Sequence, residues 1–234
     1  MLTLFLALTV VIDPGHGGSN TGAPGRAPGS YEKQVTLGIA RALKQRLEEE
    51  GVRVVLTRDR DAYLTLRERA RLANAEKPDL FISLHTNASP DHGRRGIETY
   101  VLARDSVDVE ARRAASRAPD TVQSLLTELS FLEAHRASLG LARAVQARLC
   151  AARSAATSDR GVRQAAFDVL AGVEAPAVLV EVGFIDHPIE GPELTTDDVQ
   201  ARIAQALANG IFDFASTGKP VMLSSRDAPR RSTP

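Results

Sequence analysis

Two histidines and two glutamates stand where the functional side chains of an α/β protein gather. His16 and His85 each follow an apolar segment of the chain. Glu181 directly follows another apolar run, and Glu32 opens the first amphipathic segment. Ligands of open α/β sheets bind beyond the carboxyl ends of the strands. We therefore expect these side chains, which come from four distant parts of the sequence, to converge on one edge of a sheet.

Imidazole and carboxylate are standard ligands of zinc, and a site of two histidines and one glutamate leaves a coordination position open for catalysis. Taken singly, three of the residues also have ordinary structural explanations. His16 could occupy a glycine-rich turn, Glu32 could complement a helix dipole, and His85 could bond to backbone. The turn lacks Gly-Lys-Ser/Thr, which excludes a P-loop. Glu181 lies within an apolar strand, where a carboxylate is unfavourable unless it is paired or metal-bound. Together the four favour a metal centre.

Apolar and amphipathic segments alternate along the chain and predict the elements that position these residues. Strands are expected at 2–12, 52–57, 79–84, 97–102, 167–170 and 177–180, and helices at 32–50, 65–74, 106–152 (interrupted at Pro119) and 197–214. Strands that alternate with helices indicate an α/β fold. The nearly continuous apolar strands are typical of a sheet covered on both faces. We expect a single three-layer domain, with a twisted, largely parallel sheet and helices on both faces.

Composition excludes several classes of protein. The chain has 234 residues, of which 43% are hydrophobic and 25% charged, as is usual for a globular protein and unlike a disordered, collagen-like or multi-span membrane chain. Lysine plus arginine and aspartate plus glutamate each number 29, so there is no basic excess of the kind that nucleic-acid binding requires. The single cysteine, Cys150, excludes an internal disulfide and a cysteine-rich zinc site, and we expect it to pack in the core.

The apolar N-terminal run from Leu2 to Ile12 is too short for a transmembrane helix, which needs roughly 20 residues. A signal peptide carries positive charge before its apolar stretch, but the first basic residue is Arg26. The β-branched content favours a buried strand.

Six short motifs resemble those of the zinc-dependent N-acetylmuramoyl-L-alanine amidases. They are Val11-Ile12-Asp13-Pro14-Gly15-His16-Gly17-Gly18, Tyr31-Glu32-Lys33, Leu56-Thr57-Arg58, Ser83-Leu84-His85-Thr86-Asn87-Ala88, Gly96-Ile97-Glu98-Thr99-Tyr100 and Val180-Glu181-Val182-Gly183-Phe184-Ile185. They occur in the family's order, and the resemblance extends from about Thr9 to Phe214. The set of six motifs in this order is far more specific to the family than any one of them alone.

The resemblance implies a peptidoglycan hydrolase of the bacterial envelope, periplasmic or extracellular. Such an enzyme cuts the amide between the lactyl group of N-acetylmuramic acid and L-alanine of the stem peptide. Matched motif by motif, His16, Glu32 and His85 would hold one zinc ion, and Glu181 would be the catalytic carboxylate. The catalytic domain would occupy residues 1–215, followed by a polar, disordered tail at 216–234. The family is normally exported, yet this sequence shows no convincing signal.

The sequence also suggests a role or a placement for four further residues. Asn87 either orients His85 or contacts the substrate. His187 stands where the family often has asparagine, and we expect it on the surface. His92 and His135 are likewise expected to face solvent.

Residues 103–133 resemble a helical insertion that, in some relatives from cell-division systems, covers the active site until an activator protein displaces it. The chain has a modest version of this insertion, and an ordinary surface helix is the favoured explanation of it. If it is a lid, Glu110 is the expected contact to the metal, because its carboxylate lies within the first helical piece, Ser106 to Arg117.

Two alternative functions belong to other classes. One is an inactive amidase fold that binds peptidoglycan or a partner, although all four chemical residues are present. The other is a zinc carboxypeptidase that trims stem peptides, since His, Glu and His ligands suit that reaction as well. In each case peptidoglycan is the expected partner, and neither a nucleic acid nor a transmembrane segment is expected.

Overall fold

The computed structural model describes residues 8–118, 120–153 and 158–217. This part of the chain forms six strands and six helices. The strands are β1 (Thr9–Pro14), β2 (Arg53–Leu56), β3 (Leu80–Asn87), β4 (Ile97–Leu102), β5 (Asp159–Ala165) and β6 (Ala177–Phe184). The helices are α1 (Glu32–Glu49), α2 (Leu66–Ala75), α3 (Arg104–Ala115), α4 (Thr121–Ala152), α5 (Glu190–Leu194) and α6 (Asp197–Ser216).

The strands form one sheet in the order β2-β1-β3-β6-β4-β5. The pairs β1–β2, β1–β3, β3–β6 and β4–β5 are parallel, and β4–β6 alone is antiparallel. The predicted α/β class and largely parallel sheet are therefore confirmed. Because of the single antiparallel pair, β4 and β5 run in the opposite direction to the rest of the sheet.

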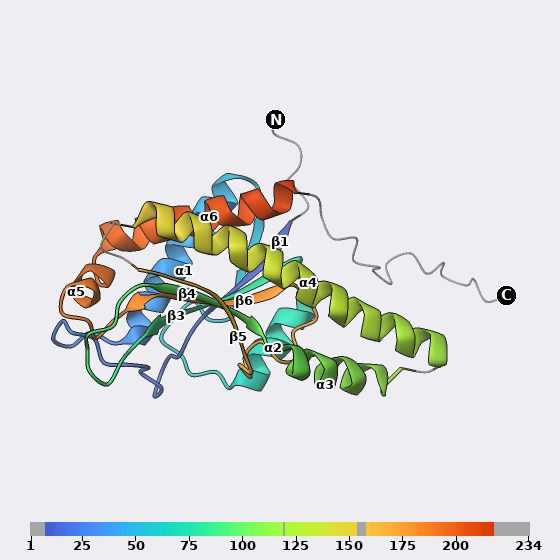
Figure 1. Ribbon diagram of the computed structural model, residues 1–234. Coiled ribbons are helices and arrows are strands. Elements are labelled where there is room, and N and C mark those ends of the chain that lie inside the picture. The colour runs from blue at the N-terminus through green and yellow to red at the C-terminus, as the bar shows by residue number, and fades with distance from the viewer. Residues whose placement is uncertain (1–7, 119, 154–157, 218–234) are drawn as a thin grey trace.

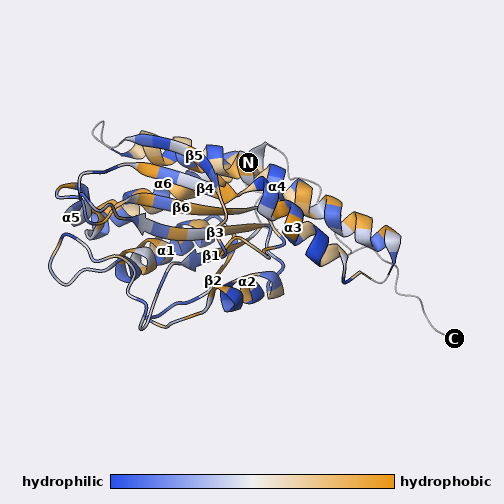
Figure 2. Ribbon diagram, turned by 60° about the horizontal axis from the view of Figure 1, so that its bottom comes forward, coloured by the Kyte–Doolittle hydropathy of each residue, from blue (hydrophilic) through white to orange (hydrophobic). Residues whose placement is uncertain are grey.

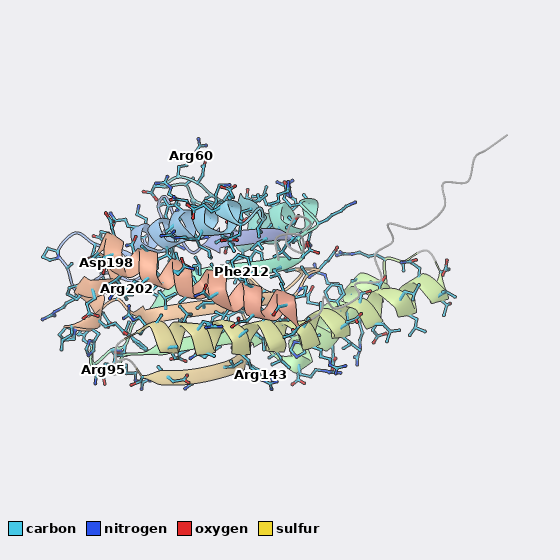
Figure 3. All side chains as sticks on the ribbon, turned by 90° about the horizontal axis from the view of Figure 1, so that it is seen from above. Arg60, Arg95, Arg143, Asp198, Arg202 and Phe212 are labelled. Carbon is cyan, nitrogen blue, oxygen red and sulfur yellow. The ribbon has the colours of Figure 1, made fainter. Side chains whose placement is uncertain are left out.

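The two faces of the sheet are covered unequally. Helices α1, α4 and α6 pack over one face in a large apolar core with β1, β3 and β6, and α4 and α6 run side by side (Figure 3). The other face carries a smaller cluster, in which α2 and the segment 167–175 cover the half nearest the amino ends of β3 and β6. Figure 2 shows hydrophobic residues concentrated in the central strands, whereas α2 is mostly hydrophilic. The predicted three layers are present. On the second face of the sheet, α2 and the segment 167–175 cover only a part, and polar side chains occupy the rest.

Helices α3 and α4 form a hairpin that extends beyond the sheet (Figure 1). Because β4 is antiparallel to β6, it ends next to the amino end of β6, and α3 leaves the sheet there. This places the hairpin at the edge opposite the carboxyl ends of β1, β3 and β6. Glu110 pairs with Arg113 of its own helix at 3.6 Å. In this arrangement the hairpin points away from the expected site, so its placement gives the lid hypothesis for residues 103–133 no support.

Most predicted elements are confirmed, with bounds shifted by a few residues. Thr65 caps α2 by accepting a hydrogen bond from Glu68 N, and Gly51 has a φ of 81° directly after α1. The strand expected at 167–170 is wrong: this segment is a turn in which Leu170 N donates to Phe167 O. The strand that precedes it, β5, was missed because it is a polar edge strand without an apolar run. Residues 1–7, Pro119 and the tail from residue 218 lie outside the described residues.

Cys150 is partly buried and packs against the main core, close to its predicted environment. Among the described residues, no helix is both long and apolar enough to cross a membrane.

Candidate active site

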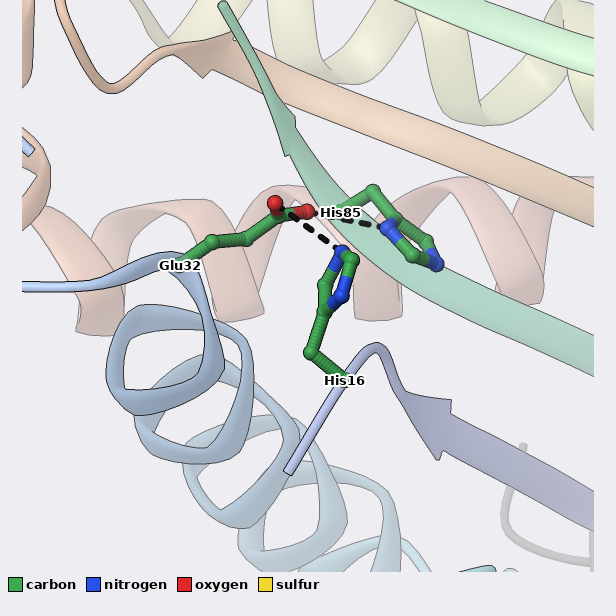
Figure 4. Close-up of side chains that lie close together, drawn as sticks. All are labelled: His16, Glu32 and His85. Carbon is green, nitrogen blue, oxygen red and sulfur yellow. Dashed lines mark hydrogen bonds and ion pairs between the residues drawn. The ribbon is translucent and has the colours of Figure 1, made fainter. Parts of the chain in front are cut away.

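His16, Glu32 and His85 meet at the carboxyl ends of β1 and β3, as the sequence predicts (Figure 4). Glu32 is the first residue of α1, and its carboxylate points between the two imidazole rings. Its Oε2 lies 3.0 Å from His16 Nε2, and its Oε1 lies 2.9 Å from His85 Nδ1. One donor atom from each residue can be chosen so that all lie within 4.8 Å of one another.

Backbone groups hold the Glu32 carboxylate in place. Ala23 N donates to Oε2 and Thr86 N donates to Oε1, each at 3.0 Å. Burial alone would raise the pKa of Glu32, which is 4% exposed, but its bonds to His16 and His85 hold the pKa far below its usual range. Burial likewise would lower the pKa of His85, but the hydrogen bond and charge of Glu32 raise it. Glu32 is thus an ionised, fully bonded carboxylate.

The loop that carries His16 is fixed from beneath by two buried arginines. Arg69 pairs with the fully buried Asp13 at 2.7 Å and donates to the carbonyl of His16 at 2.7 Å. Arg58 donates to the carbonyl of Gly15 at 2.7 Å. His16 has a φ of 60°, which is uncommon outside glycine, so this support holds an unfavourable backbone conformation.

Two glycines leave room for the cluster to close. A Cβ on Gly15 would lie 2.4 Å from the ring of His85. A Cβ on Gly22 would lie 2.6 Å from Glu32 Oε2 and 2.8 Å from the His16 ring. Any larger residue at either position would push a member of the cluster aside.

The donor set fits a divalent metal ion. A tetrahedral zinc ion bonds nitrogen and oxygen at about 2.0–2.2 Å, which sets neighbouring ligand atoms roughly 3.4 Å apart. The two His–Glu separations, 3.0 and 2.9 Å, are close to this value. Asn20 Oδ1 lies 2.9 Å from His16 Nδ1, so it can hold the proton on Nδ1 and leave Nε2 free to bind a metal. Asn20 was not among the predicted residues, and its one signal in the sequence is its place four residues after His16 in the same loop.

Glu181 lies beside this cluster on β6, directly opposite His85 of β3 in the parallel register. It stands inside its strand, three residues before the end, and not at the end as the apolar run suggested. Its Oε2 is buried and has no hydrogen-bond partner among the described residues. Burial, together with the charges of Glu32 and Glu98 and against a lowering effect of His85, raises the pKa of Glu181 to about 8.

The remaining predicted residues divide between the site and the surface. Asn87 lies at the end of β3, where its Nδ2 is 3.5 Å from Glu98 Oε1. His92 is exposed as expected, with 60% of its side chain accessible, and pairs with Asp186. His135 is half-buried on α4, so the expectation that it faces solvent is only partly met.

The prediction that His187 lies on the surface is wrong. Only 9% of the residue is exposed, and its Nδ1 accepts hydrogen bonds from Ile189 N at 3.2 Å and Glu190 N at 3.0 Å. It therefore fixes the turn into α5, a short helix that the sequence did not predict.

Comparison with known proteins agrees with this geometry. Residues 10–213 match the family described as N-acetylmuramoyl-L-alanine amidase. The N-acetylmuramoyl-L-alanine amidase AmiA of Salmonella typhimurium is 32% identical over 220 residues, which span 88% of this chain and 75% of that protein. The endolysin of Bacillus phage SPP1 is 34% identical over 223 residues, spanning 95% of this chain and 70% of the endolysin.

The crystal structure of an N-acetylmuramoyl-L-alanine amidase from Clostridium difficile 630 superposes with a TM-score of 0.72 at 30% identity. The match covers 90% of this chain and 98% of that one. Relatives named as amidases favour this activity over the carboxypeptidase alternative, and the complete set of four chemical residues argues against an inactive binding module. The chain belongs to the N-acetylmuramoyl-L-alanine amidase family, the peptidoglycan hydrolases that cleave the amide between N-acetylmuramic acid and L-alanine.

Proposed function

We propose that His16, Glu32 and His85 hold one zinc ion per chain and that Glu181 is the general base and acid of amide cleavage. The observation that carries the proposal is the convergence of three donors from distant segments to within 4.8 Å of one another. When bound there, zinc supplies Lewis-acid polarisation of the carbonyl and a lowered pKa for water.

The chain's own residues have separate tasks in this proposal. Glu181 accepts the proton of the attacking water and returns it to the departing nitrogen of L-alanine. Its unbonded Oε2 suits that task, because no neighbouring group has to be displaced before it takes a proton. Glu32 is unsuited to it, since both of its oxygens are already bonded. Asn87, at the rim of the site, is proposed to contact the substrate.

We further propose that the reaction takes place in the cell envelope, in the periplasm or outside the cell, because peptidoglycan lies there. Residues 1–215 form the proposed catalytic domain. An activator protein was expected only if the 103–133 insertion were a lid, and its position at the opposite edge gives that proposal no support.

Digestion of purified peptidoglycan by the zinc-loaded protein tests the function. New amino termini of L-alanine on released stem peptides are expected, whereas C-terminal trimming would contradict it. Metal analysis of His16→Ala tests the ligands: zinc should fall sharply from one per chain, while the exposed control His92→Ala keeps it. Full occupancy in His16→Ala would refute the ligand assignment.

A further inference from the structure

A row of charged residues continues from the metal cluster across the sheet. His85 of β3 lies opposite Glu181 of β6, and Glu181 lies opposite Glu98 of β4. Residues directly opposite one another on neighbouring strands point to the same face of a sheet. The face that holds the cluster therefore extends through Glu181 to Glu98 and on to the edge strand β5.

Two arginines of β5 contact Glu98 at the end of this row, and Arg163 reaches it from a position opposite Tyr100. Arg160 Nε lies 2.5 Å from Glu98 Oε1, and Arg163 Nε lies 3.1 Å from Glu98 Oε2. Tyr100 also donates to Glu98 Oε2, at 2.6 Å. Glu98 is only 2% exposed, so a buried carboxylate holds the guanidinium groups of both arginines in place.

The arrangement leaves positive charge facing outward. Two guanidinium groups share one carboxylate, and 48% of the Arg163 side chain is exposed. Arg160 is held further by the Phe184 ring, 5.2 Å from its guanidinium carbon. Arg163 makes its hydrogen bond through Nε, to the Arg160 carbonyl, and its Nη groups have no hydrogen-bond partner within the described part of the chain. An arginine so oriented can bind a carboxylate through two parallel hydrogen bonds.

The distance from the reacting centre restricts which anion fits. Strand β5 lies two strands from β6, or about 10 Å at the usual spacing of neighbouring strands. An extended peptide covers about 3.3–3.6 Å per residue, so this span is about three residues. On the sugar side of the scissile amide, the lactyl carboxyl is consumed in the amide itself. Only the peptide side carries carboxylates.

We infer that Arg163, oriented by Glu98 and Arg160, binds a carboxylate within the first three residues of the stem peptide. The inference rests on the proposed function, because it takes Glu181 as the reacting end of the row. Arg163 is then a specificity-determining residue that recognises an acidic peptide and holds the departing side of the amide.

Steady-state kinetics with two matched muramoyl-peptide substrates test this, one with free peptide carboxylates and one with the same groups converted to carboxamides. Arg163→Gln should raise KM for the acidic substrate about 10- to 100-fold, the range of a charge-assisted hydrogen bond, with kcat nearly unchanged. The same substitution should leave KM for the carboxamide substrate unchanged. Arg163→Lys should restore part of the loss. Arg160 still pairs with Glu98 in these variants, so the sheet edge keeps its ion pair.

Arg202→Gln is the matched control, because Arg202 lies on α6, within the helical layer that covers the opposite face of the sheet (Figure 3). The unaltered protein gives a measurement that needs no variant to fold: its KM should be higher for the carboxamide substrate by a similar factor. An equal effect of Arg163→Gln on both substrates, or none on either, overturns the inference. If the unaltered protein cleaves neither substrate, the proposed function itself fails.

Discussion

Two glutamates of one site, Glu32 and Glu181, have opposite surroundings. Glu32 receives two backbone N–H groups and two imidazoles, which hold its pKa far below the usual range despite burial. Glu181 has a buried oxygen without a partner, and burial raises its pKa to about 8. A pair of titratable groups whose surroundings push their pKa values apart is a sign of separate chemical roles. The fully bonded carboxylate suits a permanent negative charge beside a cation, and the unbonded one suits proton transfer.

The largest effect is expected from Glu32→Gln. The change removes a charged ligand and leaves the two imidazoles without a counter-charge. Zinc should be lost on dialysis against metal-free buffer, and activity should fall to that of the zinc-free protein, a larger loss than the ~10²–10⁴-fold typical of a missing general base. Metal analysis and peptidoglycan digestion of one sample measure both quantities. Retained zinc would remove Glu32 from the ligand set.

A smaller effect is expected in the pH dependence of the unfolding free energy after zinc is removed with a chelator. The folded pKa of Glu181 lies above its unfolded value, so its contribution is fully present below about pH 4.5 and is lost as pH rises towards 8. The folded pKa of Glu32 is lowered, so its contribution is present above its unfolded pKa and is lost as pH falls below it.

Denaturant unfolding of the zinc-free protein from pH 4 to 9 measures the difference. Glu181→Gln should be more stable than the unaltered protein at pH 8, and this advantage should vanish near pH 4. Curves that stay parallel over the whole range would show that Glu181 is not held protonated by burial.

The smallest effect is expected from Glu110→Gln on α3, a carboxylate at the other edge of the sheet. Its one ion pair is with Arg113 of the same helix, so stability should change by less than about 0.5 kcal/mol. Basal amidase activity should be unchanged. A raised rate would mean that the hairpin covers the site after all.

The chemistry of the site could be predicted because His16, Glu32, His85 and Glu181 each adjoin a strong apolar or amphipathic pattern. The periods of 2 and 3.6 residues reveal such elements from local sequence alone. Strand direction is not local, and the antiparallel pairing of β4 with β6 was therefore not predictable. That one reversal turns the expected lid into a hairpin at the opposite edge.

Two further errors have local causes. The edge strand β5 has the sequence Asp-Arg-Gly-Val-Arg-Gln-Ala, which lacks the apolar run of a central strand. His187, between an aspartate and a proline, has the sequence of an exposed loop, yet the backbone of α5 folds over it and donates two hydrogen bonds to its ring. The pairing of β5 and the burial of His187 both depend on tertiary contacts, which a local sequence pattern does not predict.

The most direct test of the division between the two glutamates is to measure zinc content and amidase rate in the same preparation of Glu181→Gln. The substitution keeps size and hydrogen-bonding capacity but removes the proton acceptor. We predict one zinc per chain, an unchanged melting temperature of the zinc-loaded protein, and a rate about 10²–10⁴-fold lower. Loss of zinc would make Glu181 a ligand, and full activity with zinc retained would contradict its role in proton transfer.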